Sequence, residues 1–155
     1  MISATKTCFQ KYFTLSGRAG RAEFWWFMLF QVLIGVVAVS LDVLVFGLAT
    51  LDSDFGGVFG NLISLAVLIP TITVTVRRLH DTGKPGYYIF VPVLLFVVPI
   101  ALAALVAIPG IQWLVGGAII AGGILFFWWM VQPSDPGPNA YGSGQGQAAL
   151  AEVFE

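Results

Sequence analysis

Four long apolar segments, separated by short polar ones, constrain this sequence more than any other feature. They cover residues 24–46, 58–76, 87–106 and 111–131. As helices with a rise of 1.5 Å per residue they measure about 28 to 35 Å, which matches a hydrocarbon core of about 30 Å. The chain is 58% hydrophobic and only 10% charged, whereas about a quarter of residues are charged in soluble domains. We therefore expect an all-α, polytopic integral membrane protein with four transmembrane helices.

The segments that flank the four spans have different expected roles. Phe9, Tyr12 and Phe13 recur at helical spacing among basic residues, which predicts a short N-terminal amphipathic helix at the membrane interface. Residues 1–142 are expected to form a single membrane domain, and residues 143–155 a flexible cytoplasmic tail. Because Pro, Gly, Ser and Gln already dominate from residue 133 onward, we expect mobility from there to residue 147.

The distribution of positive charge predicts the orientation. With four spans, the N-terminal segment, the loop at 77–86 and the C-terminal tail lie on one side of the membrane. All seven Lys and Arg residues fall there. By the positive-inside rule, this multi-pass protein is expected in the bacterial inner membrane with both termini in the cytoplasm. The net charge of −1 does not suggest a nucleic-acid partner.

Polar side chains mark one face of the first two spans. These polar residues recur at helical spacing. Antiparallel pairing of the two helices would bring residues of one span to the same depth in the membrane as residues of the other. Interhelical hydrogen bonds, each contributing about 0.6 to 2 kcal/mol, are one interpretation. A polar pathway for an ion or small solute is the other. The candidate intramembrane polar site consists of Gln31, Asp42, Asn61, Thr71 and Thr75.

The polar stretch at 77–88 concentrates the basic residues between the second and third spans. Arg77 and Arg78 favourably meet the negative end of a helix dipole. Arg78 continues the polar face of its helix, so we expect it to point inward and pair with Asp81 or Glu23. Arg77, about 100° round the helix, is expected to be freer to reach lipid phosphates.

Several chemistries are not supported by the residues present. One cysteine, Cys8, and one histidine, His80, do not make a zinc site. His80 beside Asp81 resembles an acid/base pair, but no nucleophile or metal cluster accompanies it. Gly83-Lys84 lacks the remaining features of a phosphate loop. We therefore assign no catalytic, cofactor-binding or metal-binding residue, expect no cofactor, and favour a protein that is not an enzyme.

Three motifs together give a family resemblance. They read GRAGRAEFWW at 17–26, RRLHDTGKPG at 77–86 and PGPNAYG at 136–142. In this order they resemble the bacterial inner-membrane family known as domain of unknown function 805, over nearly the whole chain. The resemblance implies a bacterial inner-membrane protein with several spans. It implies no catalytic residue, because the family has no established activity.

Three functional hypotheses remain open. The leading one is a non-enzymatic membrane protein whose basic cytoplasmic face binds anionic lipid or a protein partner, which includes a second copy of the chain. The second is a small transporter or channel subunit that uses the intramembrane polar residues. The third is a membrane enzyme that uses His80 and Asp81. The candidate headgroup or partner contacts are Arg18, Arg21, Arg77, Arg78, His80 and Lys84.

Overall fold

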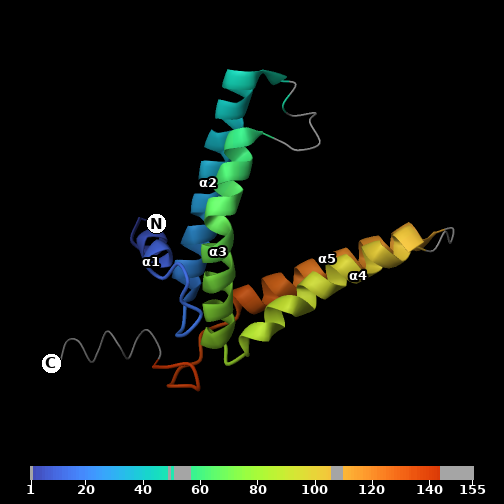
Figure 1. Ribbon diagram of the computed structural model, residues 1–155. Helices are drawn as coiled ribbons and strands as arrows, with labels where there is room; N and C mark the ends of the chain where they lie inside the picture. Colours follow the sequence, from blue (N-terminus) through green and yellow to red (C-terminus); the bar gives the residue numbers. More distant parts are fainter. Residues whose placement is uncertain (1, 49, 51–56, 106–109, 144–155) are drawn as a thin grey trace. The chain divides into compact units, whose positions relative to one another are not determined.

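The computed structural model describes residues 2–48, 50, 57–105 and 110–143, and most of these residues are helical (Figure 1). Apart from an isolated bridge between Asn139 and Gly142, the described part of the chain contains no strand. Four helical stretches within it are long and apolar enough to cross a membrane, which confirms the expected all-α polytopic class. The elements are α1 (Ile2–Gln10), α2 (Arg21–Phe46), α3 (Val58–Asp81), the 3-10 helix η2 (Gly86–Ile89), α4 (Phe90–Leu105) and α5 (Ile111–Val131).

Two of the spanning helices extend into the polar motifs. Helix α2 begins at Arg21 and α3 ends at Asp81, whereas the apolar pattern placed these boundaries at 24 and 76. Hydropathy marks the part of a helix that suits hydrocarbon, while the helix itself continues as long as its backbone groups are paired. Arg77 and Arg78 therefore lie in the last helical turns of α3.

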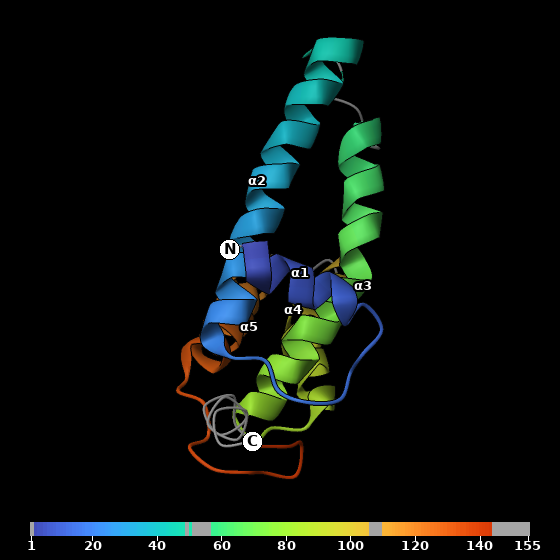
Figure 2. The ribbon, with the colours of Figure 1, turned by 90° about the vertical axis from the view of Figure 1, so that its left-hand side faces the viewer.

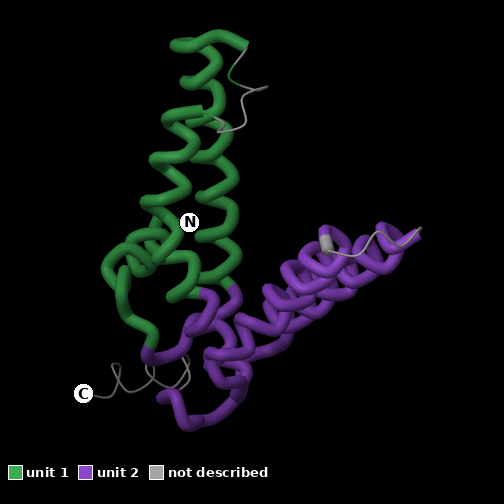
Figure 3. The backbone as a smooth tube through the Cα atoms, turned by 45° about the vertical axis from the view of Figure 1, so that its right-hand side comes forward, with its two compact units in different colours: residues 1–15, 22–74 green, residues 16–21, 75–155 purple. Residues whose placement is uncertain are grey.

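The chain divides into two compact units (Figure 3). Unit 1 comprises residues 1–15 and 22–74, and unit 2 comprises residues 16–21 and 75–155. Unit 1 thus holds α1, nearly all of α2 and most of α3. Unit 2 holds the end of α3, the hairpin of α4 and α5, and the segments that carry most of the three sequence motifs.

In unit 1, the N-terminal helix α1 lies across α2 and α3 (Figure 2). Its Phe9 ring makes edge contacts with Phe27 and Phe30 of α2, with centroid distances of 6.0 and 6.1 Å. Cys8 is completely buried, and its Sγ lies 3.8 Å from Glu23 Oε1. The amphipathic segment is therefore packed against the spans through one of its faces.

A proline in α3 explains how the N-terminal segment is attached to that helix. Pro70 has no backbone N–H, so the helical hydrogen bond from residue 70 to the carbonyl of Ala66 cannot form. The Tyr12 hydroxyl donates to this carbonyl at 2.9 Å. An unpaired carbonyl is costly in a membrane, so the tyrosine replaces a hydrogen bond that the proline removes.

Asp42 joins α2 to the beginning of α3. Its two carboxylate oxygens accept hydrogen bonds from the backbone N–H groups of Phe59 and Gly60, both at 2.9 Å. These N–H groups belong to the first turn of α3, where the helix provides no acceptor and where negative charge is favourable. A Cβ at Gly57 would overlap the Asp42 carboxylate, so glycine leaves the space that this cap needs. The expected pairing of the first two spans is confirmed.

In unit 2, α4 and α5 form a helical hairpin (Figure 1). Gly122 is buried, and a Cβ there would lie 3.1 Å from Leu95 Cβ, so the hairpin packs closely at this point. The Tyr88 ring lies 5.3 Å from that of Trp129. The connecting residues at 106–109 lie outside the described residues.

The Tyr12 contact predicts a specific energetic coupling. Tyr12→Phe should lower the free energy of unfolding by about 0.6 to 1.7 kcal/mol, the usual size of a hydrogen bond in a membrane protein. In a Pro70→Ala background the N–H of residue 70 can pair with Ala66, so the same substitution should have almost no effect. A double-mutant cycle in mixed micelles measures the coupling. If Tyr12→Phe lowered the free energy of unfolding equally with Pro70 and with Pro70→Ala, this account would be contradicted.

Candidate functional site

The three sequence motifs meet in unit 2 around one buried carboxylate. Residues 16–21 supply Arg18, the end of α3 supplies Arg78 and Asp81, and the segment after α5 supplies residues 130–142. We call Arg18, Arg78, Asp81 and the segment 130–142 that they contact the polar assembly. It consists of charged groups and backbone carbonyls that are largely removed from solvent.

Asp81 is the acceptor shared by the two arginines. Its Oδ1 lies 3.0 Å from Arg18 Nε, and its Oδ2 lies 2.5 Å from Arg78 Nη1. Ser134 Oγ also donates to Oδ2. Asp81 is 1% exposed, and Arg18 and Arg78 are 6% and 0% exposed. Because one carboxylate faces two guanidinium groups, the remaining N–H donors need other acceptors.

Arg18 finds those acceptors in the backbone of the C-terminal motif. Its Nη1 donates to the carbonyl oxygens of Gly137 at 2.6 Å and Gly142 at 3.4 Å. Its Nη2 donates to the carbonyl oxygens of Asp135 at 2.6 Å and Asp81 at 3.3 Å. A planar guanidinium with five donors suits this arrangement, and a lysine could not reproduce it.

Arg78 uses its other donors to cap α5. Its Nε donates to the carbonyl of Met130 at 3.2 Å, and its Nη2 to the carbonyl of Gln132. The last carbonyls of a helix lack intrahelical partners and carry partial negative charge. The expected pairing of Arg78 with Asp81 is present, and the same side chain also fixes the end of another helix.

The segment after α5 is ordered by further hydrogen bonds, so the expectation of mobility from residue 133 is wrong for residues 133–142. The N–H of Asp135 donates to the carbonyl of Asp81 at 2.9 Å. Asn139 Nδ2 donates to the carbonyl of His80 at 2.9 Å and to Asp135 Oδ2 at 3.2 Å. Composition indicated the absence of a helix or strand, but it could not reveal that buried arginines supply donors to this backbone. Residues 144–155 of the expected tail lie outside the described residues.

His80 does not form an acid/base pair with Asp81. Its ring stacks on Tyr141, with centroids 3.8 Å apart and planes at 2°. Its Nδ1 faces the carbonyl oxygen of Gly17 at 3.2 Å, and a Cβ at Gly86 would lie 3.2 Å from Nε2. The ring therefore fills a space between backbone segments, while the Asp81 carboxylate is held by the arginines.

The other basic candidates have different environments. The side chain of Arg77 is fully buried, so the expectation that it is freer to reach lipid phosphates is wrong. The backbone carbonyl of Arg77 accepts a hydrogen bond from the N–H of Ala19 at 3.0 Å. Arg21 is exposed. Lys84 Nζ donates to Gln132 Oε1 at 2.5 Å. Burial lowers the pKa of Lys84, the Asp135 carboxylate opposes this shift, and Arg78 adds to it.

The intramembrane polar candidates are distributed over several environments. Asp42 is buried at the beginning of α3, whereas Asn61 is exposed. The Thr71 hydroxyl donates to the carbonyl of Val67 in its own helix at 2.6 Å. Gln31 is half-buried, and Thr75 is buried within unit 2. The described contacts therefore do not join these five residues into one site.

Residues of the C-terminal motif were not among the sequence-based site candidates. Ser134, Asn139 and Tyr141 contact Asp81 or His80 through side chains, and Gly137 contacts Arg18 through its carbonyl. The usable signal was the density of turn-forming residues at 136–142. In the described part of the chain, no three His, Cys, Asp or Glu residues are grouped to hold a metal ion.

The geometry of Arg18 predicts the effect of a charge-preserving substitution. Arg18→Lys should lower the free energy of unfolding by about 3 kcal/mol, because the ammonium cannot replace the forked hydrogen bonds. Amide hydrogen exchange at residues 135–142 should rise at the same time. Arg21→Lys, at an exposed position, is the matched control and should change neither quantity. Unchanged exchange in Arg18→Lys would contradict the role given to this arginine.

Comparison with known proteins identifies a family and several relatives. The family model described as "Protein of unknown function (DUF805)" matches residues 12–143. The inner membrane protein YhaI of Escherichia coli K12 is 33% identical over 90 residues, which cover 58% of this chain and 67% of that protein. The inner membrane protein YhaH of the same strain is 28% identical over 133 residues, covering 86% of this chain and 88% of that protein.

A third relative, the uncharacterized protein YiiR of Escherichia coli K12, is 35% identical over 114 residues, covering 69% of this chain and 67% of that protein. No solved structure matches the chain at a significant level. The four candidate spans and the inner-membrane relatives support a multi-pass protein of the inner membrane. Because the family model extends over nearly all of the described residues and includes all three motifs, this chain belongs to the DUF805 family.

Proposed function

We propose that this protein is a non-enzymatic inner-membrane protein with both termini in the cytoplasm, and that its cytoplasmic face binds a protein partner through the loop at residues 135–142. The observation that carries the proposal is the set of hydrogen bonds from Arg18 to the carbonyls of this loop. The same loop also contacts the end of α3 through Asn139.

Holding this loop in one conformation costs conformational entropy, so its order calls for a physical explanation. Fixing the backbone of a residue costs about 1 to 2 kcal/mol in conformational entropy. The hydrogen bonds of the polar assembly offset that cost while Pro136, Pro138 and Ala140 remain exposed. A loop that is held in one conformation while these three side chains remain exposed is preorganised for recognition, since a partner need not order it on binding.

Burial of the arginines favours a protein partner over lipid headgroups at this site. Arg18, Arg77 and Arg78 are at most 6% exposed, and Arg18 and Arg78 already donate to Asp81 and to backbone carbonyls. A phosphate headgroup would have to displace these acceptors. Among the motif cations in unit 2, Arg21 is the exposed one and Lys84 is half-buried.

The alternatives receive less support from the geometry. An enzyme using His80 and Asp81 would require the two side chains to act together, and each is engaged elsewhere. A transport pathway using Asp42 would require that carboxylate to be available, and it caps α3. These contacts favour a catalytic role for His80 and Asp81 less than a structural one. They likewise favour a transport role for Asp42 less than a structural one.

The proposed orientation is tested with reporter fusions. All seven Lys and Arg residues lie in segments that four spans place on one side, so the positive-inside rule predicts which side is cytoplasmic. A reporter fused at Asp54 should be active in the periplasm, and one fused after Gly142 should be active in the cytoplasm. Activity on the same side for both fusions would contradict the topology.

The partner proposal is tested by site-specific photocrosslinking in cells. A photoreactive residue at the exposed position Ala140 should give a discrete protein adduct, because this position belongs to the proposed binding loop. The same residue at Leu114, which is exposed on α5, is the control and should not give that adduct. Combining the Ala140 probe with Arg18→Lys should reduce the yield at least several-fold, since the loop would lose its fixed conformation.

Two results of this experiment would overturn the proposal. One is an adduct that forms equally well from Leu114 or is unaffected by Arg18→Lys, because it would then not depend on the ordered loop. The other is crosslinking to phospholipid alone at Ala140, which would show that the loop faces headgroups.

A further inference from the structure

The N-terminal segment is only partly used in packing. Cys8 of α1 is buried, and Tyr12, in the turn after the helix, is bonded to α3. Ile2 and Lys6, four residues apart and therefore on one side of α1, are both exposed. Lys11 and Phe13, in the turn after the helix, are exposed as well.

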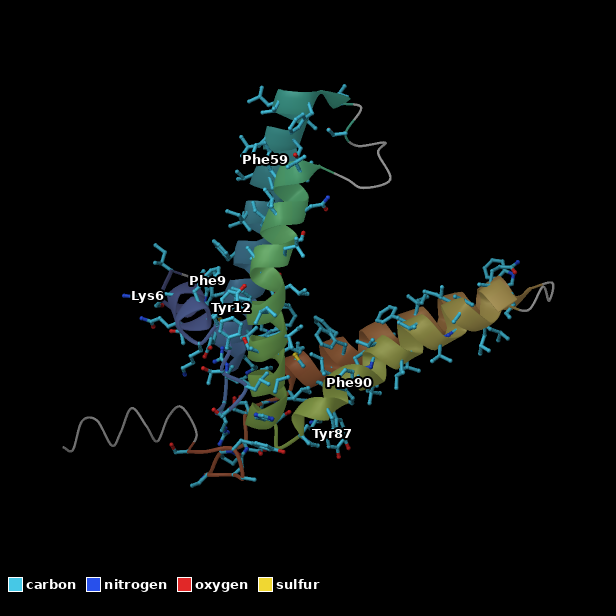
Figure 4. The ribbon with its side chains drawn as sticks, viewed as in Figure 1. Lys6, Phe9, Tyr12, Phe59, Tyr87 and Phe90 are labelled. Atoms are coloured by element: carbon cyan, nitrogen blue, oxygen red, sulfur yellow. The ribbon has the colours of Figure 1, made fainter. Side chains whose placement is uncertain are left out.

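The contacts of α1 fix its height along the spans of unit 1. Phe9 meets α2 at Phe27 and Phe30, and Figure 4 shows Tyr12 toward α3 and Lys6 extending away from it. From Phe27 to the end of α2 at Phe46 the helix measures about 28 Å at 1.5 Å per residue, which matches a hydrocarbon core of about 30 Å. The packing of α1 therefore places it at the level where hydrocarbon meets headgroups.

Charge at this level of unit 1 is positive and exposed. The acidic residues in the described part of unit 1 are Glu23 and Asp42, and both are buried. Asp42 caps the far end of α3, so it does not neutralise the lysines. Lys side chains reach headgroups while their methylene stems remain over apolar surface, so exposed lysines beside the exposed apolar residues Ile2 and Phe13 suit a membrane interface.

We propose that α1 and the turn after it form a binding surface for anionic phospholipids, with Lys6 and Lys11 contacting headgroup phosphates while Ile2 and Phe13 enter the acyl region. This surface belongs to unit 1, whereas the loop proposed to bind a protein belongs to unit 2. The Tyr12 and Phe9 contacts hold the helix in the orientation that this requires. Binding is selective for negatively charged headgroups, because the lysines provide positive charge without a nearby exposed carboxylate in the described part of unit 1.

The test compares lipid binding to the full-length protein in detergent. Phosphatidylglycerol and phosphatidylcholine with the same acyl chains are titrated separately, and bound lipid is counted by native mass spectrometry. The wild type should prefer phosphatidylglycerol. Lys6→Gln/Lys11→Gln should weaken phosphatidylglycerol binding by roughly 30-fold, the effect expected from two charges near a membrane surface. Phosphatidylcholine binding should change little.

Two control variants make the result specific to α1. Lys6→Arg/Lys11→Arg retains both charges and should retain the preference, which separates charge from folding. Arg21→Gln removes an exposed cation outside α1 and should have a smaller effect than the double Gln variant. The proposal is wrong if Lys6→Gln/Lys11→Gln keeps the wild-type preference, or if Arg21→Gln abolishes it equally well. Tight binding of free glycerol phosphate would also overturn it, because the site would then not require a lipid.

Discussion

The polar assembly depends on a single buried carboxylate, Asp81, shared by Arg18 and Arg78. Removing charged groups from water is costly unless each is paired and hydrogen-bonded. One aspartate cannot satisfy two guanidinium groups, so the arginines require backbone carbonyls from elsewhere in the chain. This requirement joins residues 16–21, the end of α3 and the segment after α5, which are far apart in sequence. The three motifs of the family therefore form one structural element.

Much of the membrane architecture could be predicted because hydrophobic length and helical periodicity are local properties. The four spans, the helical hairpin and the partnership of Asp42 with the beginning of α3 follow from them. The exact helix ends could not be predicted in this way. Helix α3 continues through Arg77 and Arg78 because their polar side chains find partners there. The pairing of Arg78 with Asp81 could be predicted because the two residues lie three apart on one helix.

The site was less predictable because it depends on contacts between segments distant in sequence. Arg77 appeared free to reach lipid because its neighbours in space could not be read from the helix alone, and it is fully buried. The segment at 133–143 appeared mobile because its composition disfavours regular structure, yet Arg18 and Asn139 supply hydrogen bonds. Similarly, the Ala66 carbonyl that Pro70 leaves without its helical partner could be matched to Tyr12 only in three dimensions.

The C-terminal position of the acceptors for Arg18 has a consequence for biosynthesis. Chains are made from the N-terminus and fold progressively during synthesis, so Arg18, Arg78 and all four spans emerge before residues 135–142. Until those residues arrive, the carbonyls of Asp135, Gly137 and Gly142 cannot accept from Arg18. The polar assembly is consequently completed as a late step, after the spans have been made. A chain interrupted before this motif would leave donors of Arg18 to water while Arg78 kept its acceptors at Asp81, Met130 and Gln132.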